Sequence, residues 1–488
     1  MSITNKSHLH SQLEVVESVA RISSRDHQKA PYMSDFKHFI RHGLGQIGMF
    51  AAAIAVSAAA GAATIPSTID PGPRAGAAAA GGSLPGLGPD EIKFFKAAKA
   101  QFVTIDSVTG SIGGESGSGL GPRFNGNVCS ACHIFPAVGG SSPKVNPQIK
   151  MAALDGAKNS LPYFITANGP VREARFVLKP DGTPDGQVHQ LFTIAGRTDA
   201  PGCKAVQPNF SAQKALNNVA LRIPTGLFGL GLIENVSDTA LRQANADHAA
   251  QKRALSVEGH FNTNSNDGTI SRFGWKAQDK SLLIFSGEAY NVEQGVTNEV
   301  FPNATDDNPT CQYTNGPEDG TFFVNGIHSG SPSSDFSSAA VNFAVFIRLS
   351  APPKPAAATP AITSGQALFH SVGCESCHFD TLTSGTSIYT NQSKVTFHPF
   401  SDFEVHRMGV GLRDGISQGS ATGDEFRTAP LWGVGQRNFF LHDGRTSNLV
   451  DAVKAHQSSG SEANTVIARF NALTTAQAQD LIAFLRSL

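Results

Sequence analysis

The chain contains the pattern Cys-x-x-Cys-His twice, at residues 129–133 and 374–378. This spacing is typical of covalent haem attachment, in which both thiols bind the porphyrin and the histidine binds the iron from the proximal side. The attachment cysteines are then Cys129, Cys132, Cys374 and Cys377, and the proximal ligands are His133 and His378. Two copies predict two haem c groups, and therefore redox chemistry.

A Cys-x-x-Cys pair alone could also be a thioredoxin-type redox pair or half of a zinc site. The histidine that directly follows each second cysteine argues against both alternatives. The recurrence argues further, because four of the six cysteines lie in the two motifs.

The composition favours a loop-rich exported protein. Lys and Arg number 38 against 39 Asp and Glu, so no charge excess indicates nucleic-acid binding. The chain has 49 glycines and 27 prolines, and only 16% of its residues are charged. Plentiful turn residues with few charges suit a secreted protein.

Residues 1–63 are expected to be an N-terminal extension with a secretory signal. Lys37 and Arg41 precede an apolar run at 47–56, and small residues follow at 58–63. This order is that of a cleavable signal, and the run is too short and too Ala-rich for a membrane span. Met33 is our hypothesis for the true start, since it leaves a signal of ordinary length. We expect a periplasmic protein whose mature chain has no stable membrane span.

Export also bears on Cys203 and Cys311, the two cysteines outside the motifs. In an oxidising compartment these two are expected to pair as a disulfide. Two free buried thiols are the alternative.

The predicted fold class is mainly α, with loop-rich and short-strand insertions and two cytochrome c-like haem domains. Periodic apolar residues predict helices from Pro89, over 362–372 and over 475–488. Residues 64–88 are expected to be a flexible leader, and the Pro/Ala-rich stretch 351–361 a linker. The expected N-terminal haem domain is 89–350, and the expected C-terminal one is 362–488.

Several motifs make the chain resemble the di-haem oxidoreductases, relatives of bacterial di-haem cytochrome c peroxidases and of the methylamine-utilisation di-haem enzyme. They are Gly-Leu-Gly-Pro-Arg-Phe-Asn at 119–125, Gly-Gly-Ser-Ser-Pro at 139–143, Arg-Phe-Gly-Trp-Lys-Ala at 272–277, Arg-Thr-Ala-Pro-Leu-Trp-Gly at 427–433 and Leu-His-Asp-Gly-Arg at 441–445. The resemblance spans roughly residue 85 to the C-terminus. It implies that peroxide reacts at the N-terminal haem, while the C-terminal haem passes electrons from a small donor protein or cytochrome. A structural calcium ion is considered beside the two haems.

The sixth iron ligands are expected to differ between the two haems. No histidine follows His133 before His189, and Met151 is read as packing, so the first haem is predicted to be open to peroxide or dioxygen. The second haem has two candidates, His456 on a helix predicted over 449–456, and Met408. We prefer His456; bis-histidine ligation gives a lower potential than His/Met ligation.

The resemblance also suggests residues around the haems. Glu293 stands where peroxidase relatives carry a glutamate, and it is the candidate general acid/base, with Glu288 as its rival. Trp275 is the candidate electron relay, with core packing as the alternative, and Trp432 is expected to pack against the second haem. Arg123 and Arg445 are candidates to pair with haem propionates.

Other functions remain open at this point. A di-haem oxygenase acting on an apolar substrate would share the double motif and the open N-terminal haem. A non-enzymatic electron-transfer cytochrome would have two closed haems, and an enzyme that oxidises a partner protein is a further possibility.

Overall fold

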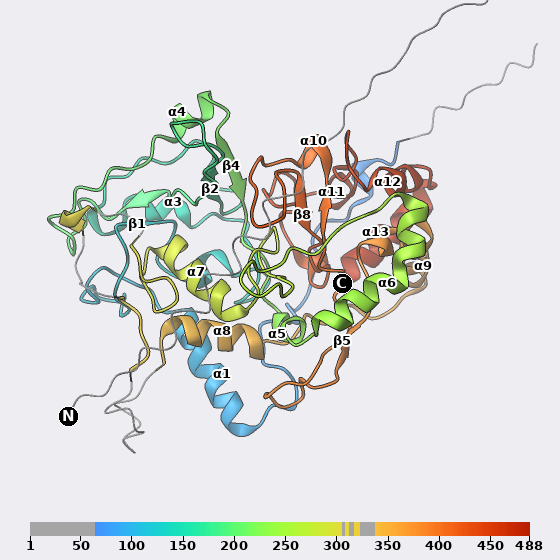
Figure 1. Cartoon of the computed structure of the whole chain (residues 1–488), viewed down its shortest axis with the longest axis horizontal. Coiled ribbons are helices and arrows are strands. Elements are labelled where there is room, and N and C mark those ends of the chain that lie inside the picture. Colours follow the sequence, from blue (N-terminus) through green and yellow to red (C-terminus); the bar gives the residue numbers. More distant parts are fainter. Residues whose placement is uncertain (1–63, 305–307, 312–316, 323–336) are drawn as a thin grey trace, which may run out of the picture. The chain divides into compact units, whose positions relative to one another are not determined.

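Helices and loops make up most of the computed structural model, which describes residues 64–304, 308–311, 317–322 and 337–488 (Figure 1). The described residues belong to one compact unit. The strands of the described part are short and pair two by two in antiparallel sheets, which confirms the mainly α fold class. The proposed signal and the start at Met33 lie outside the described residues.

Three helices build the core of the N-terminal half: α1 (Pro89–Phe102), α7 (Leu282–Gln294) and α8 (Ala339–Leu349). Helix α1 begins at Pro89 as predicted, and the Glu91 carboxylate caps its start by accepting the Gly88 N–H at 2.7 Å. Its apolar face packs on α8, where the rings of Phe102 and Phe346 lie 4.7 Å apart. Helix α8 is apolar on most of its surface, as a buried helix should be.

Shorter elements and the longer helix α6 complete the chain up to α8. The strands β2 (Glu173–Phe176) and β4 (Val219–Arg222) pair so that Glu173 lies opposite Arg222. The remaining elements are η1 (Ser67–Ile69), β1 (Arg123–Phe124), α2 (Cys129–Cys132), α3 (Gln148–Met151), η2 (Leu154–Gly156), β3 (Phe192–Thr193), α4 (Phe210–Ala215), α5 (Leu230–Glu234), α6 (Asp238–Leu255) and η3 (Pro309–Cys311).

The C-terminal half is held by α9 (Pro360–Val372) and α13 (Thr475–Ser487), which pack on each other. Both helices were predicted from the sequence, but α9 begins two residues before its predicted start. Residues Ala478, Leu481, Ile482 and Leu485 of α13 are buried, as their helical spacing indicates. The other elements are η5 (Cys374–Ser376), β5 (Leu382–Thr383), β6 (Thr396–Phe397), β7 (Val405–Arg407), α10 (Gly409–Leu412), β8 (Glu425–Arg427), η6 (Val434–Gln436), α11 (Leu449–Lys454) and α12 (Asn464–Asn471).

Residues 64–88, expected to be a flexible leader, are instead packed against both halves. Ile65 is buried in the C-terminal core, while Leu84 is buried in the N-terminal core. The Arg74 N–H donates to the Gly435 carbonyl at 2.7 Å, and the Leu84 N–H to that of Leu349 at 2.8 Å. Buried apolar side chains and backbone hydrogen bonds hold this segment in place, although its composition is rich in Gly, Pro and Ala.

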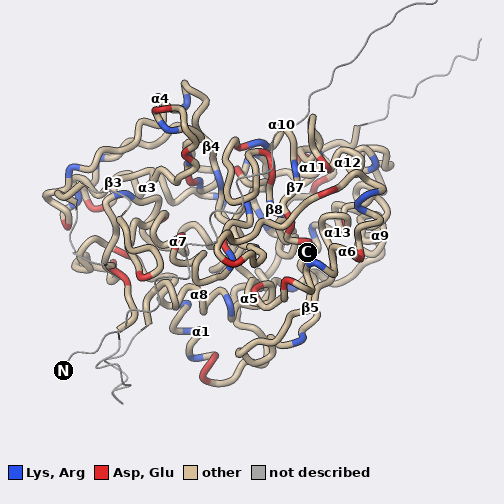
Figure 2. Tube along the Cα trace, in the orientation of Figure 1, with Lys and Arg blue, Asp and Glu red and all other residues tan. Residues whose placement is uncertain are grey.

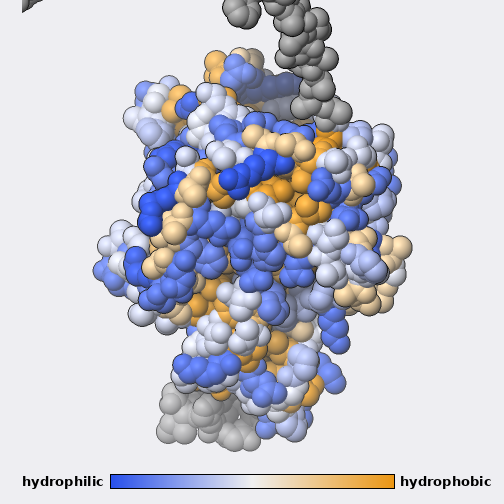
Figure 3. Space-filling view, turned by 90° about the vertical axis from the view of Figure 1, so that its right-hand side faces the viewer, coloured by the Kyte–Doolittle hydropathy of each residue, from blue (hydrophilic) through white to orange (hydrophobic). Residues whose placement is uncertain are grey.

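Cys203 and Cys311 form a disulfide, as expected. Lys and Arg residues alternate with Asp and Glu along the described trace, in keeping with the balanced charge (Figure 2). The face shown in Figure 3 mixes hydrophobic with hydrophilic side chains, as folded protein surfaces commonly do. Among the described residues, no helix combines the length and the apolar character needed to cross a membrane.

Candidate functional site

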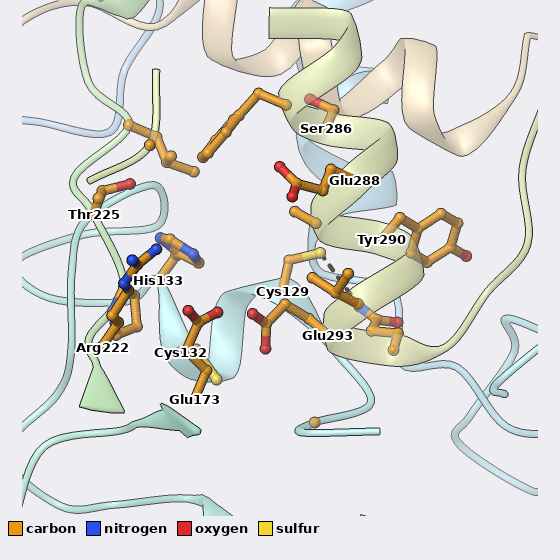
Figure 4. A pocket seen from close by; sticks show the side chains of 18 of the residues that line it. Cys129, Cys132, His133, Glu173, Arg222, Thr225, Ser286, Glu288, Tyr290 and Glu293 are labelled. Atoms are coloured by element: carbon orange, nitrogen blue, oxygen red, sulfur yellow. Dashed lines mark hydrogen bonds between the residues drawn. The ribbon is translucent and has the colours of Figure 1, made fainter. Parts of the chain in front are cut away.

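Each Cys-x-x-Cys-His motif opens onto its own cavity. The first cavity is lined by Cys129, Cys132 and His133 together with α7 and β2 (Figure 4). The second is lined by Cys374, Cys377 and His378. We call them the first and the second pocket. In each pocket, two thiols and an imidazole meet mostly apolar side chains, which suits a covalently attached haem.

Backbone hydrogen bonds fix the ring of each motif histidine. His133 Nδ1 lies 3.1 Å from the Gly140 carbonyl oxygen, and His378 Nδ1 lies 2.8 Å from that of Phe400. A carbonyl only accepts, so each Nδ1 carries the proton, which leaves Nε2 of His378 with a lone pair for a metal. The His133 ring is also hydrogen-bonded to the Thr225 backbone. Burial lowers the pKa of His378 to about 4, so its ring is neutral at pH 7, as a ligand must be.

His456 and Met408 both line the second pocket. Helix α11 ends at Lys454, two residues earlier than predicted, and His456 follows in a turn. Its Nδ1 donates to the Ala452 carbonyl at 2.8 Å, which again leaves Nε2 with a lone pair. Met408 lies just before α10 and packs against Leu412 and Phe426. The structure therefore brings both candidates to the second pocket. The hydrogen bond from His456 Nδ1 to a backbone carbonyl is typical of a histidine that binds a metal through its other ring nitrogen.

The first pocket contrasts with the second. Within the described part of the chain, its lining includes no imidazole besides that of His133 and no methionine. Met151 is buried in a separate apolar cluster, in keeping with its reading as a packing residue. Carboxyl and guanidinium groups occupy the wall instead, including Glu173, Arg175, Glu288 and Glu293.

Glu293 lines the first pocket from the last turn of α7. Gly295 ends this helix in the left-handed conformation (φ +69°), and the Glu293 carbonyl accepts the Asn125 N–H at 2.7 Å. Gly121 and Gly295 permit this close approach, since a Cβ on Gly121 would lie 2.1 Å from the Gly295 carbonyl oxygen. The loop before the first haem motif thus fixes where Glu293 stands.

Glu288, the rival of Glu293, lines the same pocket one and a half turns earlier on α7. Its carboxyl group is hydrogen-bonded to that of Asp279. Burial, followed by the charge of Glu288, raises the pKa of Asp279 well above its ordinary value. Both candidates therefore reach the pocket, but they belong to different carboxyl pairs.

Trp275 lines both pockets. Its indole Nε1–H donates to the Ile223 carbonyl at 2.9 Å, which holds the ring between them. Trp432 does not line either pocket; its ring packs 5.9 Å from that of Phe397 and against the N-terminal core. The expected packing of Trp432 against the second haem is not seen.

The arginines predicted to meet propionates lie elsewhere. Arg123 donates to the Val206 carbonyl, Arg445 pairs with Asp443, and neither lines a pocket. Arg437 lines the second pocket instead, and its buried Nε and Nη2 atoms have no protein acceptor. Arg222 lines the first pocket, with its buried Nε likewise unpaired. Unpaired guanidinium nitrogens facing two thiol-bearing cavities fit the carboxylates of haem.

A buried ionic network that we did not predict also borders the second pocket. His406 lies between Asp402 and Glu462, with each of its ring nitrogens 3.0 Å from a carboxylate oxygen. Lys252 pairs with the same Asp402 at 2.9 Å and with Glu404. His406, Asp402 and Cys377 lie close enough to hold a metal ion, but the ion pairs already satisfy His406 and Asp402.

Comparison with known proteins identifies the family. A family model described as "Di-haem oxidoreductase, putative peroxidase" matches residues 173–488, about two thirds of the chain. The chain therefore belongs to the di-haem oxidoreductases, a family of peroxidase-like proteins, and this membership implies haem as its cofactor. No curated protein matches the chain.

Three solved structures resemble parts of the chain. A hydrazine synthase chain of Kuenenia stuttgartiensis is 20% identical over 32% of this chain and 57% of that one, with a TM-score of 0.22. The diheme peroxidase BthA from Burkholderia thailandensis E264 is 20% identical over 31% and 50%, with a TM-score of 0.21. A MauG-like protein associated with microbial copper homeostasis is 15% identical over 48% and 78%, with a TM-score of 0.25. The chain thus spans little more than half of the first two, and these weak similarities carry no argument about its function.

Proposed function

We propose that the protein is a periplasmic di-haem c-type cytochrome that reduces hydrogen peroxide. Two electrons and two protons convert one peroxide into two water molecules. The observation that carries the proposal is the difference between the pockets: carboxyl groups line the first, whereas further histidines, His456 among them, line the second. The first pocket is then the reaction site and the second the electron-passing site.

The chain offers a complete set of groups to hold haem c in each pocket. Cys129 and Cys132 would bind the first porphyrin, with His133 as its iron ligand. Cys374 and Cys377 would bind the second, with His378 and His456 as ligands and Arg437 near a propionate. Haem supplies an iron centre that binds peroxide and exchanges single electrons.

Glu293 is the proposed acid/base of the first pocket. Peroxide cleavage needs a group that takes a proton from one oxygen and returns it to the other, the leaving oxygen. Burial, followed by the charge of Glu173, raises the pKa of Glu293 well above its ordinary value, which favours the protonated form that an acid needs. Apolar side chains such as Phe102 and Phe343 keep bulk water from this wall.

Trp275 is the proposed relay, since it provides one aromatic ring in the walls of both pockets. A small electron-donor protein or cytochrome would supply the electrons. The Cys203–Cys311 disulfide supports a periplasmic location, because such bonds persist in oxidising compartments. A structural calcium ion stays a prediction.

Electron paramagnetic resonance of the oxidised holoprotein tests the proposal. One high-spin and one low-spin ferric signal are expected, the high-spin one from the open first haem. Two low-spin signals would remove the open site and favour a non-enzymatic electron carrier. Mixing with peroxide, and separately mixing the reduced protein with dioxygen, then distinguishes a peroxidase from an oxygenase.

A further inference from the structure

We propose that Glu173 and Glu293 share one proton in the wall of the first pocket, and that Glu173 is a positioning residue for the acid Glu293. This inference rests on the proposed role of Glu293 and adds a residue that the sequence motifs did not indicate. Glu173 begins β2, more than a hundred residues before Glu293 on α7.

The two carboxyl groups face each other across the pocket (Figure 4). They are hydrogen-bonded to each other. Two ionised carboxylates at this range would repel each other, and two neutral ones would leave Arg175 unpaired beside them. A single shared proton satisfies both groups.

The surroundings decide which group carries the proton. The Leu191 N–H donates to Asn125 Oδ1 at 2.8 Å, which fixes the orientation of the Asn125 amide. Asn125 Nδ2 must therefore donate to Glu293 Oε2, at 2.8 Å. One oxygen of Glu293 is thus an acceptor, and the proton belongs on its other oxygen or on Glu173.

Arg175 favours the ionised form of Glu173. Its Nε donates to Glu173 Oε1 at 2.7 Å, and both side chains are largely buried. Because a guanidinium stabilises the charged carboxylate next to it, the proton of the pair stays on Glu293. The other titratable or charged groups that line the same pocket are Cys129, Cys132, His133, Arg172, Arg222, Glu288 and Tyr290.

The electrostatics of the pair agree with this assignment. Burial raises the pKa of Glu173, but the charge of Arg175, the hydrogen bond with Glu293 and the charge of Arg222 together outweigh burial, and the pKa ends below its ordinary value. Burial and then the charge of Glu173 raise the pKa of Glu293 well above its own. The acid form of Glu293 thus persists as the pH rises past the ordinary glutamate range, so long as Glu173 is ionised beside it.

Infrared difference spectra of the oxidised holoprotein at pH 7 test the shared proton. Wild type minus Glu293→Gln should contain one protonated-carboxyl band that shifts in heavy water. Wild type minus Glu173→Gln should contain the same band together with a shifted one, because burial still keeps the proton on Glu293 while the carboxylate that shared it is gone. Glu258→Gln is the matched control at a carboxylate 71% exposed, and should show no such band.

Two outcomes would overturn the pair: a band lost in Glu293→Gln but unshifted in Glu173→Gln, or no band in either difference. If Glu173→Gln fails to fold, Glu173→Asp replaces it. The shorter carboxylate should shift the band of Glu293, and an unshifted band would equally overturn the proposal.

Peroxide cleavage measured on the same variants separates this inference from the proposed function. If both bands behave as expected but Glu293→Gln cleaves peroxide at the wild-type rate, the pair stands and the function fails. If Glu293→Gln is slow but the band of Glu173→Gln is unshifted, the function stands and the pair fails.

Discussion

The indole ring of Trp275 meets the imidazole ring of His442 edge to face, with their centroids 6.4 Å apart and their planes at 74°. His442 belongs to the second pocket, whereas Trp275 borders both pockets. The Ile223 backbone joins the pair, since its carbonyl accepts from Trp275 and its N–H donates to the His442 carbonyl at 2.7 Å. The wall between the two pockets is therefore an aromatic, hydrogen-bonded layer.

Replacing Trp275 by Phe should slow electron passage between the haems by about tenfold, a barrier increase of about 1.4 kcal/mol. The smaller ring bridges the wall less completely and loses the hydrogen bond to Ile223. Stopped-flow reduction of the second haem, followed by reoxidation with peroxide, measures this rate. Trp432→Phe is the matched control, since Trp432 borders neither pocket. Equal rates in the two variants would exclude the relay.

His456→Ala should convert the second haem from low spin to high spin, because the iron loses its sixth ligand. Met408→Leu should leave the low-spin signal intact, since leucine fills much the same apolar space. Absorption and paramagnetic resonance spectra of both variants decide the question. The opposite pattern would assign the ligand to Met408 and imply a higher potential.

Glu293→Gln should slow peroxide cleavage by roughly 10²-fold or more, since the amide cannot exchange the proton. In the wild type the rate should fall as the pH rises through the elevated pKa of Glu293, because the acid form is then lost. Single-turnover kinetics against pH measure both effects. A larger loss in Glu288→Gln than in Glu293→Gln would transfer the role to Glu288.

Asp70→Asn should lower the free energy of unfolding by about 3–5 kcal/mol, because it leaves the buried Arg486 guanidinium without its partner. Burial raises the pKa of Asp70, but the hydrogen bonds from Arg486 and from the Leu449 N–H outweigh it and lower the pKa. This stabilisation is present above the ordinary Asp pKa and is lost as the pH falls through the lowered one. Denaturant titrations at several pH values measure it.

Asp90→Asn is the matched control for this variant. Asp90 pairs with Lys93 on the exposed side of α1, where the Asp90 side chain is 95% exposed. Its loss should change the free energy of unfolding by no more than about 0.5 kcal/mol. Equal effects in the two variants would mean that the Asp70 pair adds no more than a surface pair does.

The sequence predicted those parts of the fold that depend on local pattern. Helices α1, α9 and α13 carry their apolar residues at helical spacing, and Pro89 marks the start of α1. The packing of residues 64–88 could not be predicted from such a spacing. Its apolar side chains are few and irregularly spaced, and their partners lie up to 400 residues away in the chain.

The same distinction applies to the site. The haem motifs are contiguous, so their residues were found at once. Glu173 and Arg437 reach the pockets only through tertiary pairing, and both lie outside the recognised motifs. Arg123 and Arg445 lie within motifs and were therefore predicted to meet propionates, but their side chains bond to Val206 and Asp443 outside the pockets. A buried arginine without an acceptor is a signal that only the structure provides.

The segment 64–88 has a consequence for how the chain can be divided. Ile65 completes the core around α9 and α13, and Asp70 neutralises Arg486 on α13, whereas Leu84 completes the core around α1 and α8. A C-terminal fragment cut at the Pro/Ala stretch would therefore lack part of its own interior. The two halves are thus parts of one cooperative folding unit, and unfolding of residues 64–88 should disturb both cores.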